Sequence, residues 1–310
     1  MGNIEYQDAF NKFDKQFFKK CFWVDKKLFY KDLFYHIKIL FLIRKYSFNE
    51  VIHPVFSRER DYGDYFIKFF RTGEKIGFET DISIYSEVEA KASNKYYNVL
   101  IKDVYSNNFE FIRNKFFVEK LLNTSINISA PAFNIKKENN NSIVIFPGKR
   151  DVFRRWDSIK FSKVINYILI NYSDIKIIIV GGNTDIEIAN KILINVSNTN
   201  NLINLCGKTT IIELIEIINR TNLVISNETV AVHIAASTNT NCICLSNGTH
   251  YFRFNPYPSS ISKNIITLYP DFFDSMSKDQ LFQKYRYFSD VDINLIIPQK
   301  VINNVKTILK

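Results

Sequence analysis

The residue types best suited to chemistry gather in one stretch, residues 223–258. Its pattern predicts a buried strand from Leu223 to Ser226, a polar turn, and a helix that begins at Val230. Such a strand-to-helix turn directs free backbone N–H groups, the positive end of the helix dipole and a hydroxyl at one point, which suits a phosphate. The candidate phosphate ligands are Asn227, Glu228, Thr229, Val230 and His233.

Two parts of this stretch have two interpretations each. A single helical histidine such as His233 often only packs among its neighbours, but it can also support the phosphate turn. The loop after the next predicted strand, Asn241 to Leu245, either contacts the ligand or is anchored by its own aromatic side chains. Its candidate residues are Gly248, His250 and Arg253.

A second candidate for phosphate binding follows an earlier apolar strand, Ile143 to Phe146. Gly148 allows the backbone to approach a ligand closely, and Lys149 and Arg154 could neutralise a diphosphate without a metal ion. A diphosphate leaving group gains charge as the bond to it breaks, so it needs fixed cations. The alternative interpretation is a basic surface loop.

Further loops follow the strands between these two turns. In open α/β sheets, loops at the carboxyl ends of strands contact the ribose and base of a nucleotide. The acidic side chains in them could instead only stabilise a helix start. The candidates for the base and ribose are Gly182, Asn183, Asp185, Glu187, Leu205 and Lys208.

The elements that must position all these residues alternate between strand and helix from residue 143 to residue 245. This alternation predicts an α/β fold with parallel strands. The chain has 310 residues, of which 46% are apolar, enough for two hydrophobic cores.

The order of the motifs resembles a known family. They are Phe146-Pro147-Gly148, a basic pair before Trp156, Gly181-Gly182, segment 204–209, and the turn 226–229 with His233. This order is similar to that of the heptosyltransferase-like glycosyltransferases, glycosyltransferase family nine. The resemblance is good over residues 140–310 and faint over residues 30–80.

This resemblance implies a GT-B fold, in which two Rossmann-like domains face each other across a cleft. It also implies inverting, metal-independent transfer of a sugar from a nucleotide diphosphate sugar. Known members mostly use ADP-heptose and build the lipopolysaccharide core.

The sequence departs from the family in two places. Where the family turn has a glycine before the histidine, this chain has Val230, so the turn must use ordinary helical geometry or rearrange. Full-length relatives begin with an apolar strand and a Gly-Asp turn that carries the presumed general base, and residues 1–27 contain neither. We therefore expect the amino-terminal domain to be incomplete, without its first strand.

Another base must then come from elsewhere in the amino-terminal half. Asp61 and Asp64 follow a predicted strand over residues 50–56, and the Gly63-Asp64 pair imitates the missing turn. We take Asp64 as the candidate catalytic residue. The alternative is a charge-rich, solvated loop.

The domain boundary is expected in the linker 125–142, which contains Pro131 and a polar run. We expect an acceptor-side domain over residues 1–135, a donor-binding domain over residues 136–295 and a closing helix over residues 296–310.

The net charge is +10, and the first 45 residues are rich in Lys interleaved with Phe and Tyr. Such a face suits peripheral docking on the anionic inner face of the cytoplasmic membrane, although a solvated helix face is the alternative. No signal peptide or nucleic-acid motif is present, and the apolar run 33–43 is too short to span a bilayer. We expect a cytoplasmic protein with no nucleic-acid partner.

Two functions remain. The first is a glycosyltransferase that moves a heptose from ADP-heptose to a lipopolysaccharide core or another lipid-linked surface glycan, with no metal and no cofactor besides the donor. The alternative is a nucleotide-sugar-binding relative with little or no turnover. A dinucleotide oxidoreductase is disfavoured, because no G-x-G-x-x-G follows a strand.

Overall fold

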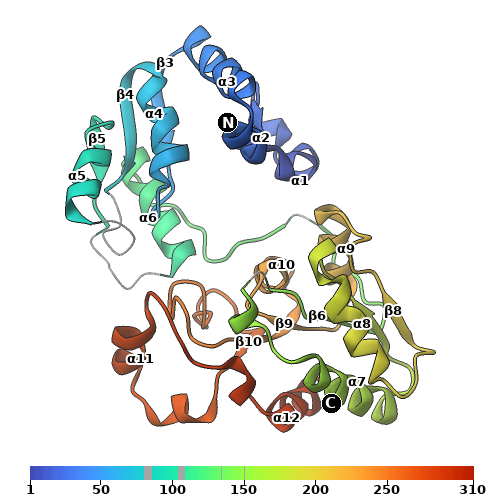
Figure 1. Cartoon of the computed structure of the whole chain (residues 1–310). Coiled ribbons are helices and arrows are strands. Elements are labelled where there is room, and N and C mark those ends of the chain that lie inside the picture. Colours follow the sequence, from blue (N-terminus) through green and yellow to red (C-terminus); the bar gives the residue numbers. More distant parts are fainter. Residues whose placement is uncertain (80–85, 104–108, 134, 150) are drawn as a thin grey trace. The chain divides into compact units, whose positions relative to one another are not determined.

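The computed structural model describes residues 1–79, 86–103, 109–133, 135–149 and 151–310. These residues form two compact units, unit 1 (Met1–Asn127) and unit 2 (Ile128–Lys310), shown in Figure 1. The division falls near the start of the linker 125–142.

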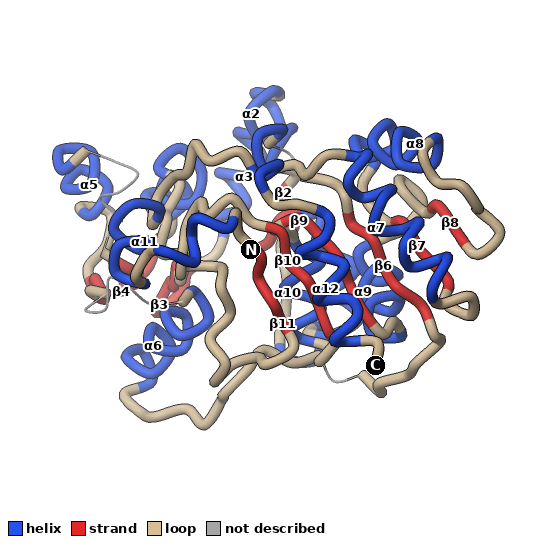
Figure 2. Tube along the Cα trace, turned by 90° about the horizontal axis from the view of Figure 1, so that it is seen from below, coloured by secondary structure: helices blue, strands red, loops and turns tan. Residues whose placement is uncertain are grey.

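Unit 2 is built on six parallel strands, seen as the row of red segments in Figure 2. In spatial order they are β11 (Ile265–Leu268), β10 (Asn241–Leu245), β9 (Leu223–Asn227), β6 (Ser142–Phe146), β7 (Lys176–Ile179) and β8 (Leu202–Asn204). Every residue of β6 and β9 is buried, as expected for central strands with both faces covered. The sequence prediction of an α/β fold with parallel strands is confirmed.

Helices cover the sheet of unit 2. Three of them contribute to one core with the strands: α7 (Ser158–Asn171), α8 (Ile186–Ile194) and α12 (Pro298–Ile308). Two others, α9 (Ile211–Arg220) and α10 (Val230–Ser237), pack against each other, and α11 (Lys278–Tyr285) follows β11. In α7 the buried side chains recur at helical spacing, with Phe161, Val164, Ile165 and Ile168 on one stripe.

Unit 1 contains a smaller parallel sheet with the order β3 (Ser47–His53), β4 (Arg71–Phe78) and β5 (Val99–Ile101). A separate pair joins two-residue strands, β1 (Gly2–Asn3) and β2 (Trp23–Val24). The helices are α1 (Gln7–Phe13), α2 (Lys26–Lys31), α3 (Leu33–Lys45), α4 (Tyr65–Phe69), α5 (Glu87–Asn94) and α6 (Glu110–Leu122). Residues 1–27 thus form short helices and very short strands.

The apolar run 33–43 lies within α3, a helix of 13 residues. Within the described ranges, no helix is long and apolar enough to cross a membrane.

Candidate functional site

In the sheet of unit 2, the order in which successive strands are added reverses at β6. The chain runs from β6 to β7 and β8 on one side, then returns to β9 on the other side of β6. Ligands of open α/β sheets bind outside the carboxyl ends of the two strands at such a switch point. Here those ends carry Gly148 and Lys149 after β6 and Glu228 and Thr229 after β9. The two turns predicted to bind phosphate are therefore neighbours, and we call this region the switch-point site.

The predicted cations of the switch-point site meet at Glu228. Arg154 Nη2 donates to Glu228 Oε1 at 3.0 Å, and Lys149 Nζ donates to the Glu228 carbonyl oxygen. Ser246, just beyond β10, donates its hydroxyl to Glu228 Oε2 at 2.6 Å. The two cations lie at the same residue, Arg154 paired with its carboxylate and Lys149 bonded to its backbone carbonyl. Ser246 was missed, although its place at a carboxyl strand end is a signal for it.

Burial also acts on the lysine of this group. It lowers the pKa of Lys149, and the charge of Arg154 lowers it further, while Glu228 opposes both effects. An incoming phosphate would act in the same direction as Glu228 and stabilise the ammonium form.

Asn227 fixes the two turns to each other. Its Nδ2 donates to the Pro147 carbonyl oxygen at 2.7 Å, and its Oδ1 accepts from the Trp156 N–H at 3.1 Å. Trp156 is fully buried and donates its indole N–H to the Ile296 carbonyl oxygen at 2.9 Å. Both ends of the Asn227 amide are thus engaged within unit 2. Its assignment as a phosphate ligand stays a prediction.

The turn after β9 has ordinary helical geometry in spite of its missing glycine. Thr229 is the N-cap of α10, with φ −138°, and its hydroxyl accepts from the Ala231 N–H at 3.2 Å. Val230 is the first helical residue and is 45% exposed. Of the two options that the sequence left open, the structure shows the first, a helix start that needs no positive φ.

His233 lies one turn into α10 and is half-buried, with Nδ1 2.6 Å from the Tyr257 hydroxyl. Burial lowers the pKa of His233, the charge of Lys149 lowers it further, and Glu228 acts in the opposite direction. Burial therefore favours the neutral imidazole of His233 over its charged form. His233 contacts Tyr257 of the loop after β10, as the packing interpretation requires. The charges of Lys149 and Glu228 also affect its pKa, as expected for a residue beside the phosphate turn. Both interpretations of His233 therefore have a basis in the structure.

The loop after β10 lies beside the same site. Burial lowers the pKa of His250, and the charges of Arg253 and Arg154 lower it further, whereas Glu228 raises it. His250 and Gly248 both have positive φ, +59° and +90°. The Arg253 guanidinium stacks 4.9 Å from the centroid of the Phe254 ring, so aromatic anchoring of this loop is also present.

The close approach of the Asp185 side chain requires a glycine at position 148. A Cβ at this position would lie 2.2 Å from the Asp185 carboxylate, which is buried and accepts from the Gly182 N–H at 2.9 Å. Asp185 thus sits between the turn after β6 and the turn after β7, and it stabilises a helix start as one interpretation predicted. A ribose contact of Asp185 or Gly182 stays a prediction.

The other predicted base and ribose residues lie apart from this carboxylate. Glu187 is exposed and pairs with Lys191 at 2.7 Å, one helical turn along α8. Leu205 and Lys208 line a cavity of about 290 Å³ together with residues of α9 such as Glu213. Asn183 is exposed near Gly207. Among the described residues, these side chains form no hydrogen bond or ion pair with Lys149 or Arg154.

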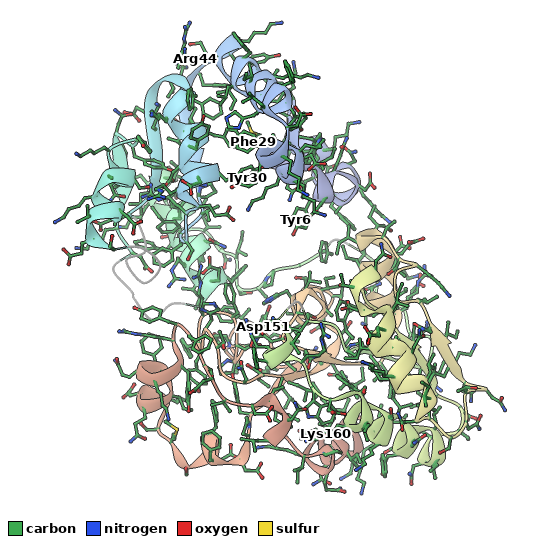
Figure 3. All side chains as sticks on the ribbon, in the orientation of Figure 1. Tyr6, Phe29, Tyr30, Arg44, Asp151 and Lys160 are labelled. Carbon is green, nitrogen blue, oxygen red and sulfur yellow. The ribbon has the colours of Figure 1, made fainter. Side chains whose placement is uncertain are left out.

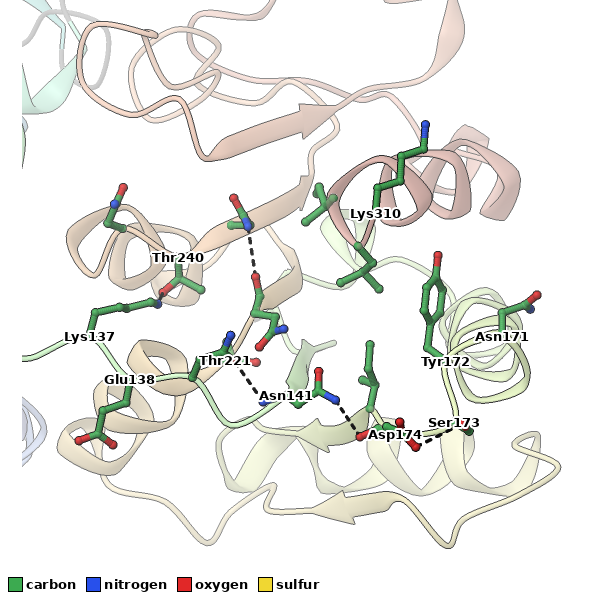
Figure 4. A pocket seen from close by; sticks show the side chains of 17 residues that line it. Lys137, Glu138, Asn141, Asn171, Tyr172, Ser173, Asp174, Thr221, Thr240 and Lys310 are labelled. Carbon is green, nitrogen blue, oxygen red and sulfur yellow. Dashed lines mark hydrogen bonds between the residues drawn. The ribbon is translucent and has the colours of Figure 1, made fainter.

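A larger cavity of about 810 Å³ lies at the opposite ends of the strands (Figure 4). Asn141, Asn222 and Asn241 line it, next to or at the amino-terminal ends of β6, β9 and β10. None of the predicted site residues lines this cavity. Because nucleotides bind at the carboxyl ends of the strands, its position does not suit the donor.

Asp64, the candidate base, is completely buried at the end of a π-helical turn, Arg60–Asp64. Its Oδ1 accepts from the Tyr97 hydroxyl at 2.5 Å and lies 3.5 Å from His53 Nδ1, and Ser93 donates to Oδ2. Burial raises the pKa of Asp64, but the hydrogen bonds from His53, Ser93 and Tyr97 and the charge of Arg58 lower it overall.

The solvated-loop interpretation of Asp64 is therefore wrong. Arg58 Nε lies 3.6 Å from the Asp64 carboxylate, and both side chains are fully covered. This geometry gives Asp64 a structural role within unit 1, and its assignment as the general base stays a prediction. The sequence could not show it, since Ser93 and Tyr97 lie about thirty residues further along the chain.

Among the described residues, no group of three or more His, Cys, Asp or Glu side chains is placed to hold a metal ion. The polar chemistry of the switch-point site comes from Lys149, Arg154, Glu228 and the start of α10. Parallel sheets in both units, with two neighbouring turns at a switch point of the larger sheet, define an α/β protein of the Rossmann-like class, in which such turns commonly bind nucleotides.

The sequence profile of glycosyltransferase family 9 (heptosyltransferase) matches residues 67–281, and the chain belongs to this family. Lipopolysaccharide heptosyltransferase 3 of Escherichia coli is 29% identical over 150 residues. These residues are 48% of this chain and 43% of that protein, so the match spans less than half of the curated relative.

Solved structures show the same fold. A family 9 glycosyl transferase from Veillonella parvula matches with a TM-score of 0.72 at 17% identity. The matched region covers 99% of this chain and 86% of that structure. The E. coli heptosyltransferase WaaC with ADP has a TM-score of 0.64 at 13% identity, with 92% and 82% covered. E. coli ADP-heptose heptosyltransferase II has a TM-score of 0.63 at 14% identity, with 88% and 80% covered. The predicted GT-B fold is confirmed.

Proposed function

We propose that this chain is an inverting, metal-independent glycosyltransferase that moves a heptose from ADP-heptose to a lipopolysaccharide core or another surface glycan. Its family supports sugar transfer, and the relatives named for ADP-heptose and lipopolysaccharide support the donor and acceptor. We place the reaction at the inner face of the cytoplasmic membrane, where a lipid-linked acceptor would be presented. The observation that carries the proposal is the convergence of Lys149, Arg154 and the start of α10 at one switch point.

In this proposal the donor diphosphate enters beside the N-terminus of α10. Arg154 then exchanges the Glu228 carboxylate for a phosphate oxygen, and Lys149 approaches the same diphosphate. The acceptor hydroxyl attacks the anomeric carbon from the opposite face, the bond to the diphosphate breaks, and the hydroxyl proton is lost to water. The two fixed cations stabilise the negative charge that grows on the leaving ADP.

The proposal is tested by replacing either cation with Ala. Each of Lys149→Ala and Arg154→Ala should weaken ADP binding by about 1.5 to 3 kcal/mol, the range for hydrogen bonds to charged groups. Adenosine binding should hardly change, because adenosine has no phosphate. Isothermal titration calorimetry with both ligands measures this difference, and Lys163→Ala, an exposed lysine on α7, is the matched control. Equal losses for ADP and adenosine would contradict the proposal.

The complete burial of Asp64 favours a second candidate, a nucleotide-sugar-binding relative with little turnover. The two are separated by measuring consumption of ADP-heptose with and without a lipopolysaccharide core extract. A chain that binds the donor but shows no acceptor-dependent consumption is the second candidate. Rapid acceptor-dependent transfer would exclude it.

A further inference from the structure

Helix α3 (Leu33–Lys45) has two apolar faces, of which only one is packed. Ile39 and Ile43 are buried in a core cluster of unit 1. On the other side of the helix, Phe34 is 87% exposed and Phe41 is 72% exposed. The exposed set, which we call the α3 stripe, consists of Leu33, Phe34, Ile37 and Phe41.

The α3 stripe is continuous because of its spacing. Phe34, Ile37 and Phe41 stand at positions i, i+3 and i+7, which share one face of an α-helix. Tyr30, on the preceding helix α2, is also exposed (Figure 3). Single exposed apolar side chains are ordinary, but several large ones together mark an interaction surface.

Cations accompany the α3 stripe. At 3.6 residues per turn, Lys38 and Lys45 lie within about 40° of Phe34 around the helix axis, and both are exposed. Arg44 adds a third charge at the end of the helix (Figure 3). Residues 1–46 carry nine Lys and one Arg against five Asp and Glu, an excess of five positive charges.

We propose that the α3 stripe docks the protein on an anionic lipid surface. The helix lies in the plane of the bilayer surface, with Leu33, Phe34, Ile37 and Phe41 among the upper parts of the acyl chains and the cations at the level of the phosphates. Its length of 13 residues, about 20 Å, is too short to cross the roughly 30 Å hydrocarbon core. Since Ile39 and Ile43 hold α3 to unit 1, docking needs no unfolding.

Docking by this surface would bring unit 1 close to lipid-linked acceptors. This role in sugar transfer rests on the proposed function. The combination of aromatic side chains and flanking cations favours lipid over a second copy of the chain, because two such faces would bring like charges together. Vesicle binding itself needs no sugar transfer, so the two proposals can fail separately.

The test uses the full chain and sedimentation with two kinds of vesicle, phosphatidylcholine alone and an equal mixture with phosphatidylglycerol. The native chain should bind the mixed vesicles and bind phosphatidylcholine weakly. Phe34→Ser with Phe41→Ser should weaken binding to the mixed vesicles about tenfold or more. Ile170→Ser with Ile194→Ser removes two equally exposed apolar side chains from unit 2 and should change nothing.

Charge is tested in the same way. Lys38→Glu with Lys45→Glu should weaken binding to the mixed vesicles about tenfold or more, and added salt should reduce the difference. Lys263→Glu with Lys278→Glu changes the net charge equally on unit 2 and is the control. Circular dichroism and thermal unfolding must show that each variant is folded.

Three results would overturn the proposal. They are a native chain that binds neither kind of vesicle, aromatic variants that bind as the native chain does, and a native dimer in light scattering that dissociates in the aromatic variants. ADP binding is measured in the same samples. A chain that binds vesicles but not ADP refutes only the proposed function, and the reverse result refutes only the docking surface.

Discussion

At the scale of single residues, the arginine of the switch-point site is paired with a carboxylate of the same unit. Arg154 and Glu228 are both largely buried and pair at 3.0 Å, and Ser246 occupies the other carboxylate oxygen. A buried guanidinium without an anion would be costly, so the carboxylate keeps the arginine in place while no ligand is bound. The same carboxylate competes with a phosphate for the arginine.

Glu228→Gln should therefore bind ADP at least as tightly as the native chain, with a gain of up to about 1.5 kcal/mol from the uncontested arginine. Calorimetry with ADP measures the gain. Glu138→Gln removes an exposed acid that pairs with Arg220 and should change little. If a folded Glu228→Gln variant loses ADP binding, the carboxylate contacts the ligand directly.

Asp64 makes a prediction about pH. The pKa of Asp64 in the folded chain lies below its ordinary value. The ionised carboxylate therefore stabilises the fold fully at pH values above its unfolded pKa of about 4. This stabilisation is lost as the pH falls through the folded pKa. Asp64→Asn should cost about 3 kcal/mol at pH 7, because it removes the carboxylate charge that faces the buried Arg58 guanidinium. Below pH 4 the difference between the two chains should shrink.

Urea unfolding of both chains between pH 3 and pH 7 checks this dependence. Asp61→Asn is the matched control, since Asp61 is 74% exposed and pairs with the neighbouring Arg60. Its effect should stay below about 0.5 kcal/mol. A difference between Asp64→Asn and the native chain that persists unchanged at pH 3 would show that packing, not charge, is lost.

At the scale of elements, the turns after β6 and β7 approach each other closely where Gly148 faces the Asp185 carboxylate. Gly148→Ala should destabilise the chain by about 1 to 3 kcal/mol, because the new methyl group would overlap the Asp185 carboxylate. At Gly182, a Cβ would lie 3.8 Å from the same carboxylate, so Gly182→Ala is the control and should be nearly neutral.

Thermal or urea unfolding of the two alanine variants gives the comparison. In an Asp185→Ala background the cost of Gly148→Ala should fall, since the overlap is gone. If Gly148→Ala unfolds like Gly182→Ala but loses ADP binding, the glycine serves the ligand alone.

The sequence predicted the elements of unit 2 better than the contacts between them. Strands β6, β9 and β10 are short apolar runs, and their bounds lie within one residue of the predicted strands Ile143–Phe146, Leu223–Ser226 and Asn241–Leu245. The bond from Ser246 to Glu228 and the approach of Asp185 to Gly148 join different strand ends. Such contacts depend on strand order, which local periodicity does not encode.

Unit 1 shows the same limit more strongly. The run EVIHPVF predicted a strand over residues 50–56, and the structure has β3 from Ser47 to His53. The Asp64 carboxylate is the centre of a buried network, and two of its partners, Ser93 and Tyr97, come from α5 and the segment after it. Charge-rich sequence is usually solvated, and only the fold reveals an exception.

At the scale of the whole molecule, the switch-point site lies entirely within unit 2. We therefore expect a chain of residues 128–310 to fold and to bind ADP with nearly the affinity of the full chain. Circular dichroism must first show that it is folded, and calorimetry then compares the two affinities. A folded unit 2 without measurable ADP binding would mean that unit 1 supplies part of the donor site.

The fully engaged amide of Asn227 has a consequence for how this protein can evolve. Both ends of the Asn227 amide form hydrogen bonds that connect the two turns. A substitution at this position would lower the amount of folded protein, so it would be lost by selection whatever its effect on donor binding. Changes of sugar specificity would have to arise in the loop that carries His250 and Arg253, where side chains can vary without separating two strand ends. Directed evolution towards another nucleotide sugar should accumulate its changes in that loop and leave the asparagine untouched.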